Sequence, residues 1–258
     1  MLPFITALCP TYRKPDCLRN SLACWLAQEY PRDRCELLIH DSANQFATQA
    51  GESWRLTRLE ERPPSLPAKY NAMIAAADSR TDLFVVWDDD DVYLPHHLGS
   101  HVAAMQRGTS GLDSLRGHWS KPREVLSTYT RQPLVESAAG RFHGSIAIGA
   151  DMLRTIGGWP LTLRADFDQQ IIATLQANHS PADPIDIAPP SYVFRWGSTG
   201  VYHSQHVMRD PADETWYARV PDISHQLDSE PITLTPRMDE ETASLFAQWA
   251  PLTLRDYR

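Results

Sequence analysis

Short apolar runs alternate with amphipathic stretches through the first half of the chain. Continuous apolar runs are typical of strands buried on both faces, and apolar residues at i, i+4, i+7 and i+8 are typical of helices. This alternation predicts an α/β fold with a mostly parallel central sheet flanked by helices. The expected strands cover 4–9, 36–39, 54–59 and 83–87, and the expected helices cover 15–30, 67–77 and 95–107.

The pattern beyond residue 107 is less regular. Strands are possible at 125–129 and 145–148, and a short helix from Ala150 should stop at a pair of glycines, 157 and 158. Apolar spacing over 167–175 predicts one further amphipathic helix. We therefore expect one domain in two halves, 1–107 and 108–205, followed by a C-terminal extension over 206–258.

Composition indicates an ordinary soluble protein. The 258 residues are 42% hydrophobic, enough for a full core, and carry a formal net charge of -8. Because Lys and Arg form no block, general binding to nucleic acid or to anionic membranes is disfavoured. No apolar stretch is long enough for a transmembrane segment and the N-terminus lacks a basic signal region, so a cytoplasmic location is expected. The four cysteines form no C-x-x-C pair, which predicts core residues rather than a zinc site or disulfides.

Four consecutive carboxylates, Asp88 to Asp91, directly follow the apolar run 83–87. This acid cluster should lie at the carboxyl end of a buried strand, where ligands bind in open α/β sheets. Like charges this close raise one another's pKa unless water or a cation compensates, so a hard divalent cation would explain them. A solvated acidic turn is the alternative interpretation of such a run.

Five segments in chain order resemble motifs of the GT-A glycosyltransferases of family 2. The pattern P-T-Y-N-R-P-x-x-L is similar to PTYRKPDCL at 10–18, and S-x-L-x-Q-x-Y-P is similar to WLAQEYP at 25–31. The V-V-D-D-G-S pattern corresponds to LIHDS at 38–42, where His40 replaces the first Asp. Residues 69–76 are similar to the helix before the acidic strand, and DDDDVYLP at 88–95 resembles D-x-D-D-x-x-x-P.

The resemblance implies a Rossmann-like GT-A fold in which 1–107 bind a nucleotide sugar and 108–205 form the acceptor-binding, catalytic half. It implies that Tyr12, beside Thr11, stacks on the donor's base and that Asp41 accepts the ring N–H. A tyrosine face and a carboxylate suit these two tasks. A surface aromatic at Tyr12 and a turn cap at Asp41 are the ordinary alternatives.

The same resemblance implies contacts to the donor's diphosphate and ribose. Lys69 would face the diphosphate, unless it is simply an exposed helix lysine, and Asp88 would contact the ribose. Asp90 would bind Mn²⁺ or Mg²⁺, which assists departure of the diphosphate. Asp89 is grouped with the nucleotide-binding residues. Both Asp89 and Asp91 would lie behind the residues that contact the ligand, or in solvent.

On the acceptor side, Asp166 matches the family's catalytic base, an Asp that opens a helix after a Gly-Gly-aromatic turn. Ala165 replaces the usual Glu, so Asp168 is a rival, and either Asp could simply cap the helix. Trp159 and His143 are further acceptor-side residues, although a lone His is often structural. His203 could complete the metal shell or close over the diphosphate.

Together these features predict a metal-dependent, inverting glycosyltransferase that moves a sugar, with UDP as the expected donor nucleotide, to a hydroxyl. Glycans, lipids, proteins and a hydroxymethylated DNA base all offer a hydroxyl, and the acidic balance disfavours the last. Two alternatives stay open. Asp88-x-Asp90 also fits the motif of HAD-like phosphatases, which place it on their first strand, and a non-catalytic sugar- or cation-binding domain could share the fold.

Overall fold

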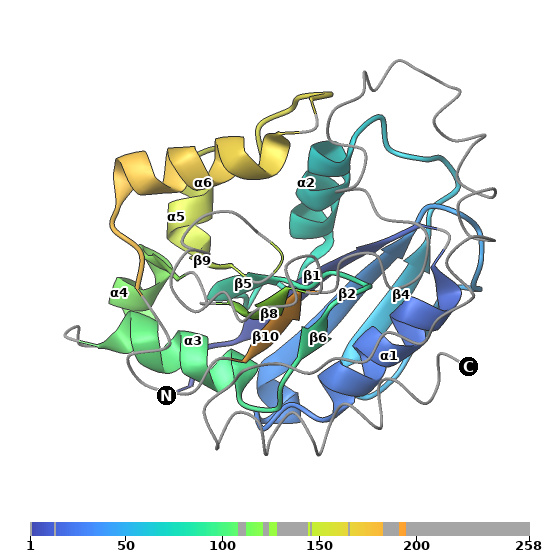
Figure 1. The fold of residues 1–258 in the computed structure, drawn as a ribbon, viewed down its shortest axis with the longest axis horizontal. Helices are drawn as coiled ribbons and strands as arrows, with labels where there is room; N and C mark the ends of the chain where they lie inside the picture. Colours follow the sequence, from blue (N-terminus) through green and yellow to red (C-terminus); the bar gives the residue numbers. More distant parts are fainter. Residues whose placement is uncertain are drawn as a thin grey trace.

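A seven-stranded sheet, in the order β3-β4-β2-β1-β5-β9-β7, forms the centre of the protein (Figure 1). The computed structural model describes residues 2–12, 14–107, 112–120, 124–127, 144, 146–164, 166–182 and 191–194. The strands of both sheets are β1 (Ile5–Thr11), β2 (Cys35–Asp41), β3 (Gln49–Ala50), β4 (Trp54–Arg58), β5 (Leu83–Val86), β6 (Val92–Tyr93), β7 (Trp119–Ser120), β8 (Glu124–Ser127), β9 (Ala147–Gly149) and β10 (Tyr192–Phe194). The helices are α1 (Pro15–Leu26), α2 (Leu66–Ala76), α3 (His97–Gln106), α4 (Leu112–Arg116), α5 (Ala150–Thr155) and α6 (Phe167–Asn178), with a 3-10 turn at Arg32–Arg34.

The four central strands of this sheet are parallel. β4, β2, β1 and β5 run in one direction, whereas β3, β9 and β7 pair antiparallel at the edges. The mostly parallel central sheet predicted from the sequence is therefore confirmed.

Helices cover both faces of the sheet (Figure 1). On one face, α1 and α3 pack with Ile5, Ala7 and Cys9 of β1. On the other face, α2, α5 and α6 pack with Leu8 of the same strand. Because successive strand residues point to opposite faces, a strand covered on both sides must be apolar throughout. All four cysteines are buried, as expected for core residues. No helix among the described residues is long and apolar enough to cross a membrane.

β1 and β2 extend further than the apolar pattern predicts. Their parallel pairing continues to Thr11 opposite Asp41, so both polar residues belong to strands and not to loops. The sequence pattern also missed helix α4 and strands β3, β6, β7 and β10, because elements this short show no measurable periodicity.

A second, three-stranded sheet, in the order β6-β10-β8, adjoins the acid cluster. β6 begins directly after Asp91 and pairs with β10, which places Tyr93 opposite Tyr192. Both tyrosines are fully buried. This small sheet therefore brings a residue from late in the chain to the end of β5.

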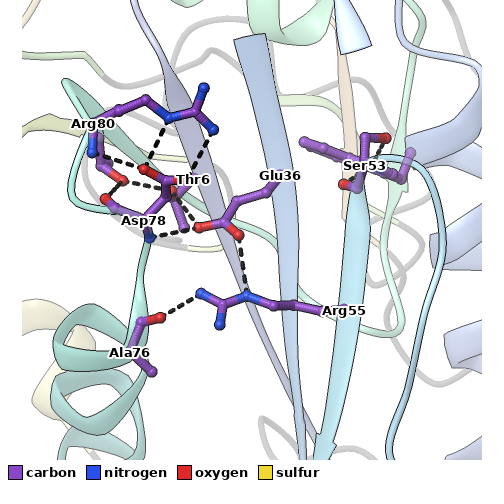
Figure 2. A network of polar contacts seen from close by, with 9 residues as sticks. Thr6, Glu36, Ser53, Arg55, Ala76, Asp78 and Arg80 are labelled. Atoms are coloured by element: carbon purple, nitrogen blue, oxygen red, sulfur yellow. Dashed lines mark hydrogen bonds and ion pairs between the residues drawn. The ribbon is translucent and has the colours of Figure 1, made fainter. Parts of the chain in front are cut away.

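A network of polar contacts ties together the amino ends of the central strands (Figure 2). Glu36 accepts from the Thr6 hydroxyl at 3.0 Å, from Arg55 Nε at 3.1 Å and from the Asp78 backbone N–H at 2.9 Å. Asp78 in turn accepts from Arg80 Nε at 3.0 Å and from its Nη2 at 2.8 Å. These contacts lie at the sheet edge opposite to the acid cluster, so they stabilise the sheet away from the strand ends where the site is expected.

Candidate functional site

The ends of three neighbouring strands bring several expected site residues together. β2, β1 and β5 are adjacent in the sheet, and Thr11 and Asp41 are the last residues of β1 and β2. The acid cluster follows β5, which ends at Val86. The Thr11 hydroxyl donates to Asp89 Oδ2 at 2.7 Å, so these strand ends are in direct contact.

The acid cluster points into the protein rather than into solvent. Asp89 is 5% exposed and Asp91 is 2% exposed, which excludes a solvated acidic turn. Each of the four carboxylates has a partner of its own. These are the Tyr70 hydroxyl for Asp88 at 3.3 Å, the Thr11 hydroxyl for Asp89 at 2.7 Å, the Lys14 ammonium for Asp90 at 2.5 Å and the Tyr192 hydroxyl for Asp91 at 2.5 Å.

Burial and mutual repulsion act together on these carboxylates. Burial is the main reason why the pKa of Asp88 is well above its usual range, and the charges of Asp91, Asp90 and Asp89 raise it further. Burial also raises the pKa of Asp89, while the Lys14 ammonium opposes that shift. Protons or a cation are needed to relieve such a concentration of negative charge.

Lys14 supplies a buried positive charge to the acid cluster. Its side chain is 5% exposed, and its Nζ lies 2.5 Å from Asp90 Oδ2 and 3.7 Å from Asp89 Oδ1. Sequence reasoning missed this residue, although a lysine in the loop after the first strand, next to an expected acidic edge, was an available signal. Removing one partner of a buried ion pair costs about 3–5 kcal/mol, because the other charge is left uncompensated.

The acid cluster suits a hard divalent cation that is held in part by a ligand. Among the described residues, no group of three or more His, Cys, Asp or Glu side chains is arranged to hold a metal ion. Mg²⁺ and similar ions, however, often bind through one or two carboxylates together with substrate phosphates. Burial and the charges of Asp91, Asp90 and Asp89 disfavour the ionised form of Asp88. Asp90 is therefore the candidate ligand among the four, and Lys14 would have to share it with the ion.

The expected base-stacking residue, Tyr12, carries a cation on one face. The guanidinium carbon of Arg62 lies 4.3 Å from the centroid of the Tyr12 ring. Tyr12 itself is partly buried at the end of β1. A guanidinium placed over an aromatic ring is attracted electrostatically by the ring's π electrons.

Asp41 organises the loop that follows β2. Its Oδ1 accepts from the backbone N–H of Ala43 at 2.8 Å, and its Oδ2 accepts from those of Gln45 and Phe46 at 2.6 and 3.0 Å. The carboxylate is fully buried. Two lone-pair positions on each oxygen leave one on Oδ1 for a ring N–H. Asp41 therefore caps a turn, the ordinary alternative for this residue.

Lys69 is buried rather than exposed on its helix. Its Nζ donates to the Thr11 carbonyl at 2.7 Å and to the Ser42 hydroxyl at 2.8 Å. An ammonium has three donors, so one N–H remains for an anion beside the ends of β1 and β2. Burial lowers the pKa of Lys69 to about 8.

His40 replaces an acid of the family pattern with a neutral group. Burial, followed by the charges of Lys69 and Arg55, lowers the pKa of His40 to about 4. A neutral imidazole therefore stands at the end of β2 at neutral pH. The site has one negative charge fewer than the family pattern implies.

The acceptor-side residues are placed differently from one another. Trp159 is 1% exposed and its ring stacks on that of Tyr70, with the centroids 4.7 Å apart. Its side chain is therefore part of the core. Asp166 lies at the N-cap of α6, but its side chain makes no capping hydrogen bond. Asp168 accepts from the backbone N–H of Gln169 at 2.8 Å.

Asp166 forms an ion pair instead of a helix cap. Arg164 donates to its two oxygens from Nε and Nη2, both at 3.0 Å, and Gln170 Nε2 donates at 2.9 Å. The bonds from Arg164 are the main reason why the pKa of Asp166 is lowered. Oδ1 accepts two of these bonds and Oδ2 accepts one, so Oδ2 keeps one lone-pair position for the proton of an incoming hydroxyl.

His143, His203, Ala165 and the 206–258 extension lie outside the described residues. Gly144, next to His143 in the sequence, does contact the acid cluster. The Tyr93 hydroxyl donates to its carbonyl at 2.5 Å and accepts from the Asp88 backbone N–H at 2.6 Å. A Cβ at position 144 would lie 2.4 Å from Asp88 Oδ2. The chain at Gly144 therefore packs directly on the end of β5.

Comparisons with known proteins agree with this arrangement. The family model described as Glycosyl transferase family 2 matches residues 6–157. No curated protein matches the chain.

Solved structures share the fold at low sequence identity. S. aureus TarS 1-349 in complex with UDP-GlcNAc aligns with a TM-score of 0.60 and 14% identity, covering 98% of this chain and 72% of that one. S. aureus TarS 1-349 without a named ligand aligns with a TM-score of 0.57 and 14% identity, covering 98% and 80%. The mannosyltransferase PcManGT from Pyrobaculum calidifontis, in complex with GDP-Man and Mn²⁺, aligns with a TM-score of 0.54 and 17% identity, covering 98% and 81%.

Proposed function

The chain belongs to glycosyl transferase family 2, and from that premise we propose that it transfers a sugar from a UDP-sugar to an acceptor hydroxyl with inversion. The observation that carries the proposal is the buried acid cluster in contact with Thr11 at adjoining strand ends. Membership of the family sets aside the phosphatase alternative. A binding domain that has lost activity is the remaining competitor, and the experiment below separates the two.

The donor would lie across the carboxyl ends of β1, β2 and β5. Tyr12 would stack on the base, and Asp41 Oδ1 would accept the uracil N–H. Lys69 would direct its remaining N–H to the diphosphate, and Asp88 would hold the ribose. Related donors and Mn²⁺ appear in the complexes of similar fold, which supports this choice of ligands.

A divalent cation would be held by Asp90 together with the diphosphate, and it would supply Lewis-acid stabilisation to the leaving group. Asp166 would accept the proton of the acceptor hydroxyl at the remaining position on Oδ2. Holding donor and acceptor in line then accounts for much of the rate enhancement. The acceptor itself is proposed only as a hydroxyl-bearing molecule.

The test is a calorimetric screen of UDP, GDP, CDP and dTDP sugars with and without Mn²⁺. UDP-sugars should bind most tightly, and only with the metal. Asp90→Asn should weaken metal-dependent donor binding by about 10- to 100-fold or more. Loss of a residue that only orients a metal ligand already has an effect of this size, and loss of the ligand itself should cost at least as much. Asp33→Asn, at a carboxylate that is 80% exposed, serves as the control.

Unchanged affinity and Mn²⁺ dependence in Asp90→Asn would overturn the proposed metal site. Preference for another nucleotide would overturn the choice of UDP. Donor binding without any hydrolysis or transfer would favour the binding domain.

A further inference from the structure

Asn71, on α2, holds the backbone of Trp159 with both ends of its side-chain amide. Its Nδ2 donates to the Trp159 carbonyl at 2.9 Å, and its Oδ1 accepts from the Trp159 N–H at 2.9 Å. The two residues are 88 positions apart in the chain. An amide that pairs with the N–H and C=O of one residue fixes both its position and its orientation, as a neighbouring strand would.

The turn before Trp159 is shaped for this contact. Gly157 and Gly158 have φ angles of +77° and +81°. Residues other than glycine rarely adopt this backbone conformation. A Cβ on Gly158 would lie 2.6 Å from Asn71 Oδ1. Gly158 is therefore required twice, once for its backbone conformation and once for the close approach of Asn71.

Neighbouring residues of α2 contact other parts of the site. Tyr70 stacks on the Trp159 ring at an interplanar angle of 14°, and its hydroxyl donates to Asp88 Oδ1 at 3.3 Å. Lys69 holds the Thr11 carbonyl at 2.7 Å. One turn of helix thus touches the end of β1, the acid cluster and the turn at 157–159.

The turn at 157–159 leads to the proposed base. In the sequence, residues 160–165 connect Trp159 to Asp166, which lies at the N-cap of α6. Leu161 and Leu163 in this connection are exposed at 78% and 68%, so they do not anchor it to the core. Among the described residues on the amino-terminal side of Asp166, Trp159 is the nearest buried one.

We propose that Asn71 is a positioning residue that sets the start of α6, and with it Asp166, relative to the donor site. The proposal rests on the proposed function for the role of Asp166, but the coupling itself is a property of the fold. Loss of the amide contact should loosen the segment from Trp159 to the start of α6 and leave the donor-binding strand ends in place. Turnover should then fall while donor affinity is kept.

The test compares Asn71→Asp, Gly158→Ala and Ser65→Ala. Asn71→Asp keeps the size of the side chain but turns its donor into a repulsive oxygen, and Gly158→Ala disturbs the same contact from the other partner. Ser65→Ala is the matched control, because the Ser65 hydroxyl caps α2 by accepting from the Ala68 N–H at 3.2 Å and does not touch the turn. Hydrogen exchange, UDP affinity with Mn²⁺ and hydrolysis of UDP-GlcNAc are measured for each.

Both contact variants should exchange faster over 157–164 and at the start of α6, whereas Ser65→Ala should change exchange only in α2. We expect UDP affinity within about twofold of wild type and hydrolysis slower by about 10- to 100-fold, the effect of a misplaced group.

Exchange unchanged over 160–170 in both contact variants would overturn the coupling. Equal losses of UDP affinity and hydrolysis, or wild-type hydrolysis despite faster exchange, would overturn the positioning role. A wild-type protein that binds no UDP would instead refute the proposed donor, and the exchange data would still decide the coupling.

Discussion

At the scale of single residues, burial beside the strand ends changes the protonation of a side chain, and Lys69 is a clear case. The sequence placed it on a helix, where an exposed lysine was the ordinary expectation. Packing instead buries it at 4% exposure against the Thr11 carbonyl and the Ser42 hydroxyl. Desolvation disfavours its charged form, which is the form that binds a phosphate.

This burial leads to a pH dependence of donor affinity. The charged, protonated form of Lys69 prevails below its pKa of about 8 and is lost above it. Affinity for UDP should therefore fall between pH 7 and 9, by as much as about tenfold per pH unit above 8. Calorimetric titrations of UDP with Mg²⁺ across this range measure the effect.

Lys69→Arg is the matched control, because guanidinium stays charged throughout this range. The affinity of this variant for UDP should not change with pH, apart from any effect of the titration of UDP itself, which both proteins share. Parallel profiles for the two proteins would mean that Lys69 does not contact the diphosphate in the complex.

At the scale of elements, the sheet places the Glu36 network and the candidate site at opposite ends of its parallel strands. The Glu36 network joins the amino ends of β1, β2 and β4 (Figure 2). The acid cluster and its partners occupy the carboxyl ends. Parallel strands make this separation possible, because all their carboxyl ends meet at one edge.

Glu36→Ala should therefore lower stability and leave binding unchanged. It would leave the Asp78 N–H without its acceptor and Arg55 Nε without its partner, a loss of about 1–3 kcal/mol. Urea unfolding measures this loss, and calorimetry with UDP should give the wild-type affinity. The exposed Glu52→Ala is the control and should change stability by no more than about 0.5 kcal/mol. Loss of donor affinity in Glu36→Ala, at a temperature where it is folded, would contradict the separation of the two edges.

At the scale of the whole molecule, the proposed function requires the proposed donor-binding half and acceptor-binding half to meet. The same sheet includes β9 and β7 from the second half, and Gly144 packs on Asp88. The proposed base, Asp166, opens α6, which packs on the face shared with α2 and α5. The two halves thus share one core.

Asp166→Asn should separate donor binding from proton transfer. If Asp166 accepts only the acceptor's proton, the variant should keep its fold and donor affinity while turnover falls by about 10²–10⁴-fold. Asp168→Asn should lose much less. Donor hydrolysis provides the assay, and melting temperature checks the fold. Equal losses in both variants together with a lower melting temperature would indicate a helix start that needs both carboxylates, and His143 would become the next candidate for the base.

The sequence by itself determined the class of fold and the edge at which the site lies. Continuous apolar runs identified strands covered on both faces, and polar residues at their ends placed Thr11, Asp41 and the acid cluster side by side. These inferences succeed because they depend on local periodicity and on the shared direction of parallel strands. The resemblance to family 2 used the same local segments.

Only the tertiary structure decided which partners complete the site. Lys14 beside Asp90, Tyr192 beside Asp91 and Asn71 on Trp159 join residues 76, 101 and 88 positions apart. No local pattern encodes such contacts, because they arise from how helices and a second sheet pack on the strand ends. Whether Lys69 is buried, and whether Asp166 caps a helix or pairs with Arg164, is likewise set by packing and by competition among nearby donors.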